Sequence, residues 1–173
     1  MLPLIPRARR LGLLLAGLAA LQACSAATSG QDARPAPPLT TVRIQQINGK
    51  LLVPVVLNDG QTATLLLDTG ASMTVITADL ARRAGAEPDP TKARARIASG
   101  QEVDVSLVRL KSIRVGAAKV GDLRVAVYEL AALNRSPSLP VAIDGFLGMD
   151  FIGRFTMTLD PRAATLTLQP ALQ

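Results

Sequence analysis

Short apolar segments separated by turn residues recur along most of this chain, which is the pattern of β-strands joined by tight connections. The first three segments are divided by Asn48-Gly49 and by residues 58–60, both of which favour two-residue hairpin turns. The strands predicted in this way cover residues 42–47, 51–57, 62–67, 113–115, 120–127, 155–159 and 165–169. Gly121-Asp122 is expected to interrupt the fifth of them. The sequence therefore predicts an all-β fold in the main.

Helical signals are few. Thr77 is placed to cap a short helix that runs through Ala84 and ends at Gly85, with Leu80 facing inward. A second helical turn is expected after residues 145–149, as far as Gly153. Residues 134–140 contain two prolines and are expected to form a surface loop. The fold should therefore contain one or two short helices among its strands.

Composition and charge narrow the classes of function. The formal charge of +6 includes three arginines within the first ten residues, which leaves about +3 with acids and bases interspersed. Basic residues are scattered, and the chain has one tyrosine, three phenylalanines and no tryptophan on which bases could stack. Lys92, Arg94 and Arg96 are expected to form a solvated strand face. No nucleic-acid partner is predicted.

The first 23 residues are expected to be a signal peptide, because arginines at positions 7, 9 and 10 precede an apolar run over residues 11–21. This run is shorter than the roughly 20 residues needed to cross a bilayer. Leu21-Gln22-Ala23-Cys24 resembles a bacterial lipobox. The resemblance implies that Cys24 is lipidated and anchors the protein to a membrane; an ordinary signal peptide with an incidental cysteine is the alternative.

Ser25 follows Cys24 where inner-membrane retention would favour aspartate, so the periplasmic face of the outer membrane is expected. Residues 24–40, rich in Ala, Ser, Gly and Pro, are expected to form a flexible tether. Residues 41–173 are left for folding, which is enough for one domain.

One strand ends in a candidate site. Leu65, Leu66 and Leu67 form an apolar strand that delivers Asp68 into a turn, and the glycine two residues later allows the backbone to approach the carboxylate. Thr69 can donate a hydrogen bond nearby. A three-residue match also occurs by chance as ordinary turn chemistry, so its surroundings decide its meaning.

Those surroundings resemble a known family. Asp68-Thr69-Gly70-Ala71-Ser72, followed by Phe146-Leu147-Gly148, is similar to the retropepsin-like, single-lobe aspartic proteases of clan AA. The resemblance spans roughly residues 41–169 and implies an acid-protease barrel lobe, in which the second motif packs beside the catalytic loop. It further implies that the hairpin over residues 93–107 is a flap with Ser99 and Gly100 at its tip. An ordinary exposed hairpin is the alternative.

Peptide hydrolysis by this route uses two aspartates that share one proton. The chain has a single Asp-Thr-Gly, so the resemblance implies a homodimer in which Asp68 of each protomer meets at a twofold axis. Thr69 would then brace the paired loops, Gly70 would let the polypeptide substrate pass close, and Ser72 would bond the outer carboxylate oxygen. Asp144 and Asp150 flank the second motif and are expected to serve structure.

Rival chemistries lack their residues. The chain has no histidine, which excludes Ser-His-Asp and Cys-His catalysis and removes the commonest zinc ligand. It also has no glycine-rich phosphate loop. No metal and no cofactor are therefore expected. Two functions stay open: an aspartic endopeptidase, and a catalytically silent retropepsin-like domain that binds a peptide or protein at the cell envelope.

Overall fold

The computed structural model describes residues 39–97, 100–137 and 139–171. These residues form eleven strands and three short helices, so the prediction of a mainly β fold is confirmed, with one helix more than expected. The strands are β1 (Thr40–Arg43), β2 (Gln45–Ile47), β3 (Lys50–Leu57), β4 (Gln61–Leu67), β5 (Val75–Ile76), β6 (Glu87–Arg96), β7 (Glu102–Val115), β8 (Ala118–Val127), β9 (Gly145–Leu147), β10 (Phe155–Asp160) and β11 (Thr165–Pro170). The helices are α1 (Ala78–Arg83), α2 (Ala131–Asn134) and α3 (Met149–Ile152).

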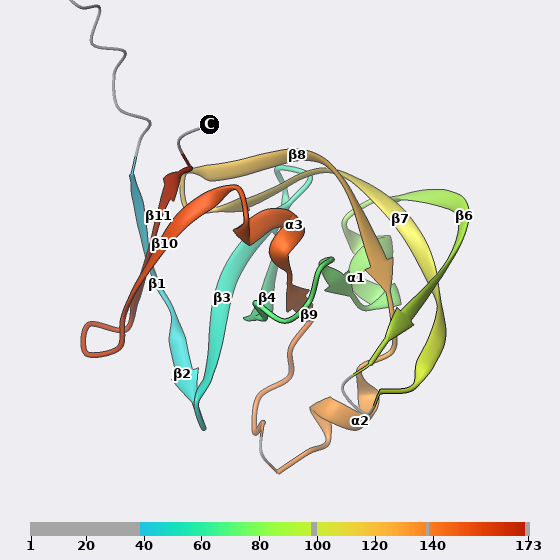
Figure 1. Cartoon of the computed structure of the whole chain (residues 1–173), viewed down its shortest axis with the longest axis horizontal. Helices are drawn as coiled ribbons and strands as arrows, with labels where there is room; N and C mark the ends of the chain where they lie inside the picture. Colours follow the sequence, from blue (N-terminus) through green and yellow to red (C-terminus); the bar gives the residue numbers. More distant parts are fainter. Residues whose placement is uncertain (1–38, 98–99, 138, 172–173) are drawn as a thin grey trace, which may run out of the picture. The chain divides into compact units, whose positions relative to one another are not determined.

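Two sheets contain these strands. The larger has the order β2-β3-β4-β9-β5-β8-β7-β6, and a further pairing between β3 and β7 turns it back on itself. The long strands β7 and β8 arch across one end of β3 (Figure 1). The smaller sheet, in the order β1-β11-β10, joins the beginning of the described chain to its end. In this sheet β11 lies between β1 and β10 and forms antiparallel pairs with both, so both of its edges are hydrogen-bonded.

Turns form where the sequence predicts them. Asn48 and Gly49 have φ angles of 48° and 74°, and Asn58 and Asp59 have 48° and 59°, which is the left-handed pair that tight hairpin turns require. Helix α1 begins after Thr77, whose hydroxyl accepts a hydrogen bond from the backbone N–H of Leu80 at 3.2 Å. The predicted hairpins and the predicted helix cap are thus confirmed.

Three element boundaries differ from expectation. Strand β6 begins well before the predicted hairpin, and β7 joins the hairpin strand and the segment at residues 113–115 into one strand of 14 residues. The expected interruption at Gly121-Asp122 was wrong. Strand β8 continues through both residues with the same register to β7 on either side, although Asp122 has a φ of 51° and is not among the paired residues.

Apolar side chains fill both faces of β3. Val53, Val55 and Leu57 point into the main core, whereas Leu52 points into a second, smaller cluster. Phe151 of α3 is fully buried in the main core and packs on Phe155 with ring centroids 5.2 Å apart. The second cluster is formed by Leu52, Leu130, Leu139 and Ile143 and lies under the segment that contains α2. On β4, which leads to Asp68, Leu65 and Leu67 pack in the main core and Leu66 packs against the second cluster, so this strand is also supported from both sides.

Candidate active site

The Asp68 loop follows the end of β4 and is hydrogen-bonded to strand β9. The backbone N–H of Asp68 donates to the carbonyl of Leu147 at 3.0 Å, and its carboxylate Oδ1 accepts from the N–H of Gly70 at 2.9 Å. A Cβ at Gly70 would lie 3.2 Å from that oxygen, so the glycine leaves room for the carboxylate. Thr69, Gly70 and Ser72 are exposed. The loop therefore presents a bonded carboxylate at an open surface.

Strand β9 brings the second motif to this loop. It pairs in parallel with β4 and antiparallel with β5, so it is inserted between the two strands that flank Asp68. Phe146 stands opposite both Leu66 and Val75 in these ladders. The N–H of Met149 then donates to the carbonyl of Ala71 at 2.8 Å. The structure thus brings together the two motifs that the sequence analysis had paired.

Close backbone contact explains the glycine of the second motif. A Cβ at Gly148 would lie 2.6 Å from the carbonyl carbon of Met73 and 2.8 Å from the backbone nitrogen of Thr74. Contacts of this kind cannot be relieved by turning a side chain, since the atoms in the way belong to the backbone of the candidate catalytic loop. A side chain at position 148 would push that loop away.

Thr74 and Asp150 connect the two motifs, and the sequence analysis missed this pair as part of the site. The hydroxyl of Thr74 donates to Asp150 Oδ1 at 2.6 Å and accepts from the N–H of Gly148 at 3.1 Å. The N–H of Thr74 donates to Asp150 Oδ2 at 2.9 Å, and Oδ1 also accepts from the N–H of Phe151. A polar residue before the apolar pair 75–76 was the signal available in the sequence.

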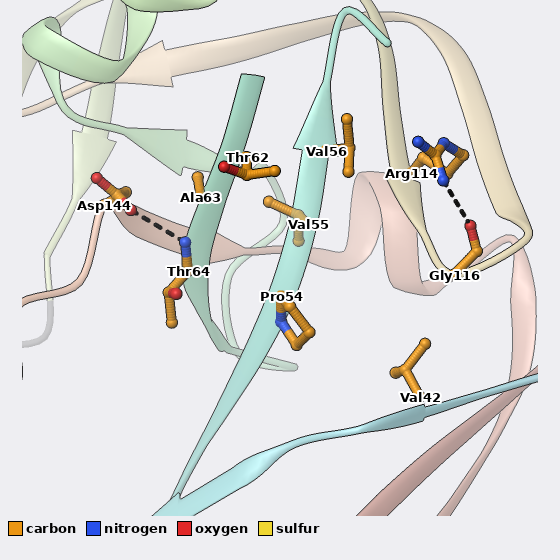
Figure 2. Close-up of a pocket in the computed structure, with 10 residues that line it drawn as sticks. All are labelled: Val42, Pro54, Val55, Val56, Thr62, Ala63, Thr64, Arg114, Gly116 and Asp144. Atoms are coloured by element: carbon orange, nitrogen blue, oxygen red, sulfur yellow. Dashed lines mark hydrogen bonds between the residues drawn. The ribbon is translucent and has the colours of Figure 1, made fainter. Parts of the chain in front are cut away.

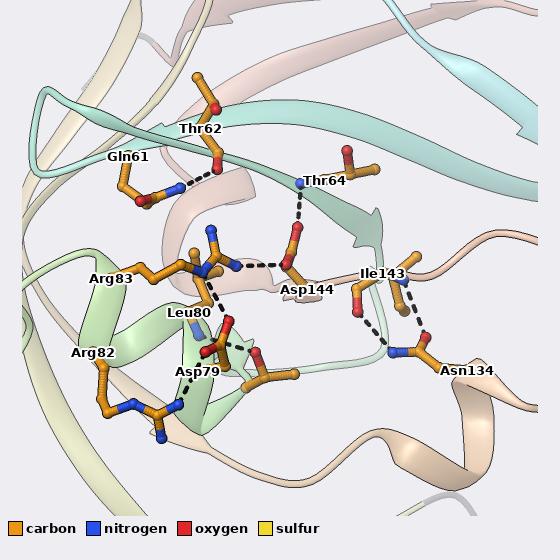
Figure 3. A network of polar contacts seen from close by, with 11 residues as sticks. Gln61, Thr62, Thr64, Asp79, Leu80, Arg82, Arg83, Asn134, Ile143 and Asp144 are labelled. Atoms are coloured by element: carbon orange, nitrogen blue, oxygen red, sulfur yellow. Dashed lines mark hydrogen bonds and ion pairs between the residues drawn. The ribbon is translucent and has the colours of Figure 1, made fainter.

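Asp144, which precedes β9, joins strand β4 to helix α1 (Figure 3). Its carboxylate accepts from the N–H of Thr64 at 2.9 Å and from the guanidinium of Arg83 at 3.1 Å. Arg83 also binds Asp79 at 2.8 Å, and this bond holds the pKa of the Asp79 carboxyl below its ordinary value. Asp144 and Asp150 therefore both bond the protein's own backbone, in line with the structural roles expected for them.

Some of the other predicted residues lie within the described part of the chain, and others lie outside it. Gly100 has a φ of 84° and its N–H donates to the carbonyl of Ile97 at 2.8 Å, which forms the turn of the β6–β7 hairpin. Ser99 and Cys24 lie outside the described residues. Arg94 and Arg96 are exposed and pair with Asp104 and Glu102 across the hairpin, so these two arginines do form a solvated strand face.

An open groove of about 600 Å³ lies on another part of the surface (Figure 2). Its lining includes Pro54 and Val56 of β3, Thr62 and Thr64 of β4, and Arg114 of β7. Asp68 is not among the residues that line it. The groove is therefore separate from the candidate active site.

Within the described residues, the structure contains neither a cluster of metal-binding side chains nor a helix that could span a membrane. Among residues 39–97, 100–137 and 139–171, no three His, Cys, Asp or Glu side chains gather closely enough to hold a metal ion. Within those same ranges, no helix has the length and apolar character that a membrane crossing requires.

Comparisons with known proteins agree with this geometry. The family model described as aspartyl protease matches residues 53–151, a span that contains both motifs. A retropepsin-like aspartic protease from Rickettsia conorii is 19% identical, covers 77% of this chain and 92% of its own, and superposes with a TM-score of 0.55. No curated protein sequence matched the chain.

Two further solved structures superpose with lower TM-scores. The EIAV protease complexed with the inhibitor HBY-793 is 22% identical over 60% of this chain and 86% of its own, with a TM-score of 0.42. The retroviral protease-like domain of Ddi1 from Leishmania major is 17% identical over 72% of this chain and 94% of its own, with a TM-score of 0.45.

The strand order, with β9 between β4 and β5, and the Asp-Thr-Gly loop define a retropepsin-like fold, as the Rickettsia structure also indicates. Because the family model spans more than half of the sequence, this chain belongs to the aspartyl protease family. The predicted fold class is therefore confirmed.

Proposed function

We propose that this protein is an aspartic endopeptidase that acts as a homodimer, with Asp68 from each protomer forming the catalytic pair. One observation carries the proposal: the Asp68 carboxylate is held by the Gly70 N–H in a loop whose next residues are exposed. Each chain brings one such carboxylate, and the mechanism of this family needs two. A twofold axis beside the loop supplies the second.

The proposed reaction divides the work between the two aspartates. Two carboxylates about 3 Å apart hold one proton between them. The ionised one takes a proton from a water molecule, which attacks the carbonyl carbon of the scissile peptide bond. The protonated one gives its proton to the carbonyl oxygen. When the tetrahedral intermediate collapses and the C–N bond breaks, the aspartate that took the proton of the water gives it to the departing nitrogen, and the other aspartate takes back a proton from a hydroxyl of the intermediate.

The surface around the loop supports a dimer. Met149 is 41% exposed, although it is apolar, and its backbone bonds the loop at Ala71. An exposed apolar side chain beside an incomplete site is suited to an interface between two copies. In such a dimer Thr69 is placed to brace the paired loops, and Ser72 to bond the outer oxygen of the carboxylate.

The hairpin of β6 and β7 is proposed to cover an extended polypeptide substrate. Its charged side chains gather on one face, where Arg94 and Arg96 pair with acids on the opposite strand. The other face carries Ala93, Ala95, Val103 and Val105, all partly buried in the single protomer. We further propose that lipidated Cys24 anchors the dimer at the periplasmic face of the outer membrane, on the strength of the lipobox-like sequence.

Cleavage of a denatured-protein or peptide library by residues 25–173, measured from pH 3 to pH 8, tests the proposal. We expect cleavage with a bell-shaped pH profile, since the pair must hold one proton. Asp68→Asn should abolish it, a loss of at least about 1,000-fold, because the Asn side chain cannot take a proton from water. Asp59→Asn, an exposed change in the turn between β3 and β4, is the control and should leave cleavage within about twofold.

Equal cleavage by wild type and Asp68→Asn would show that the activity belongs to another group or a contaminant. A folded, dimeric wild type that cleaves nothing at any pH would instead favour the silent binding domain.

A further inference from the structure

The β6–β7 hairpin loses its support from the sheet at a defined point. Strand β7 pairs with β8 from Ser106 onward, and the pair Ser106–Val127 is the last before β8 ends. Beyond it, residues 102–105 pair only with β6, so the outer part of the hairpin is a two-stranded ribbon. We call residues 93–97 and 100–105 the flap ribbon. A two-stranded ribbon is stable only if its base is held.

A β-bulge lies at the same point. The register between β6 and β7 shifts between Asp89, which faces Leu107, and Ala93, which faces Val105. Residues 90–92 therefore stand opposite Ser106 alone. Bulges interrupt the ladder and bend the strand locally. The flap ribbon thus has fewer hydrogen bonds at its base than along its length, and bending is easiest there.

Asp89 is the residue that leads into the bulge, and its side chain is only 8% exposed. Its Oδ1 accepts from the N–H of Thr91 at 2.9 Å, which fixes the first residues of the bulge. Its Oδ2 lies 3.9 Å from a guanidinium nitrogen of Arg109 and 3.9 Å from one of Arg124. A shielded carboxylate, on a strand whose other charged side chains are exposed, therefore links all three strands at the base of the flap ribbon.

The two arginines need this carboxylate. Arg109 and Arg124 stand directly opposite each other on β7 and β8, and like charges in such a pair repel. Asp122 binds Arg109 at 2.7 Å on the exposed side, with its own side chain 77% exposed. Asp89 lies between the two guanidinium groups on the shielded side. Its negative charge offsets their repulsion where solvent screens least.

Local hydrogen bonds keep Asp89 ionised. The hydroxyl and N–H of Thr91 lower the pKa of the Asp89 carboxyl below its ordinary value, and the charges of Arg124 and Arg109 act in the same direction. These contacts therefore favour the ionised form of the Asp89 carboxyl.

We propose that Asp89, Arg109 and Arg124 form a clamp that fixes the base of the flap ribbon and places its pivot at residues 90–92. Asp89 is then a positioning residue for capture of an extended polypeptide, because the clamp sets where the flap ribbon stands before it closes. The part that concerns substrate rests on the proposed protease function. The part that concerns the pivot stands on the contacts alone.

Hydrogen–deuterium exchange on the whole folded protein tests the clamp. Asp89→Asn keeps the shape of the side chain and removes its charge, and Arg124→Gln removes one partner from a half-exposed position. Each should speed exchange in the flap ribbon at least about threefold while amides of β3 and β4 exchange as in the wild type. Asp59→Asn also removes an exposed carboxylate from an ion pair, with Lys119, but lies in the turn between β3 and β4, outside the clamp and the flap ribbon, and should leave exchange in the flap ribbon unchanged.

Kinetics on a cleaved peptide supply the second measurement. Asp89→Asn and Arg124→Gln should raise KM at least about threefold with kcat within about twofold, because substrate capture changes and the Asp68 pair does not. Unchanged exchange in both variants, or acceleration spread evenly over the protein, would overturn the clamp. A lower kcat at unchanged KM would also overturn it, since that result reports only a loss of folded protein. The exchange result needs no substrate, so a lack of cleavage would count against the protease proposal alone.

Discussion

At the residue scale, the arrangement of the Asp68 loop depends on Thr74, a residue outside the Asp-Thr-Gly motif. Its hydroxyl bonds Gly148 and Asp150 at once, and the residue is fully buried. Replacing this buried hydroxyl by a methyl group would break both bonds and leave the Gly148 N–H unpaired. Thr74 therefore matters to the site although it lies six residues beyond the candidate catalytic carboxylate.

Thr74→Val is the variant that measures this bond pair. The side chains have nearly the same shape, so the change should destabilise the protein by about 1–3 kcal/mol through the unpaired Gly148 N–H and the lost bond to Asp150 Oδ1. Urea unfolding gives the value. Thr156→Val, at an exposed position of β10, is the matched control and should change the free energy of unfolding by less than about 0.5 kcal/mol. Equal effects from both variants would show that the hydroxyl of Thr74 is dispensable.

At the scale of elements, the site depends on β9 fitting between β4 and β5. Gly148→Ala places a methyl group 2.6 Å from the backbone of Met73 and should destabilise the protein by about 1–3 kcal/mol while displacing the Asp68 loop. Thermal unfolding, read with the cleavage assay, measures both effects. At Gly121 the nearest atom to an added Cβ is 3.5 Å away, so Gly121→Ala is the control. Comparable losses in the two variants would contradict the role given to Gly148.

Much of this element pattern could be predicted, because it depends on residues close in sequence. Asn48-Gly49 set a hairpin turn, and Thr77 with Gly85 set the limits of a short helix. The first half of β6 could not be predicted, since Pro88, Pro90 and charged residues argue against a strand. It forms because β7 offers a long partner that β8 already holds. Pairing between strands overrides local preference here.

The same distinction applies to the candidate site. Asp68, Gly70 and Gly148 were found from two short motifs, since each motif is continuous in sequence. The Asp89 clamp and the bond from Thr74 to Asp150 were missed because their partners lie on other elements, the clamp's on strands β7 and β8 and Asp150 on helix α3. No local pattern indicates which arginine of a strand will meet a given carboxylate. Such contacts become visible only once the strand register is known.

At the scale of the whole molecule, the proposed dimer predicts a dominant-negative effect: a chain without Asp68 should inactivate the wild-type chain with which it pairs. If subunits exchange and each site needs Asp68 from both protomers, an equal mixture of wild type and Asp68→Asn leaves about a quarter of the dimers active. The mixture should therefore cleave at about half the rate of a sample that contains the same concentration of wild-type chains and no variant. Activity that stays proportional to wild-type protein, with exchange verified by mass-tagged subunits, would indicate that one chain is sufficient.

The insertion of β9 between β4 and β5 also has a consequence for the life of the protein during its synthesis. The bond from Gly148 to Thr74 joins residues 74 positions apart in sequence, and Asp68 receives its backbone partner only from Leu147. A chain still emerging from the ribosome carries Asp68 long before that partner exists. Contacts so distant in sequence form late in folding. A growing chain therefore contains the candidate catalytic residue without the site until residues 147–150 have been made.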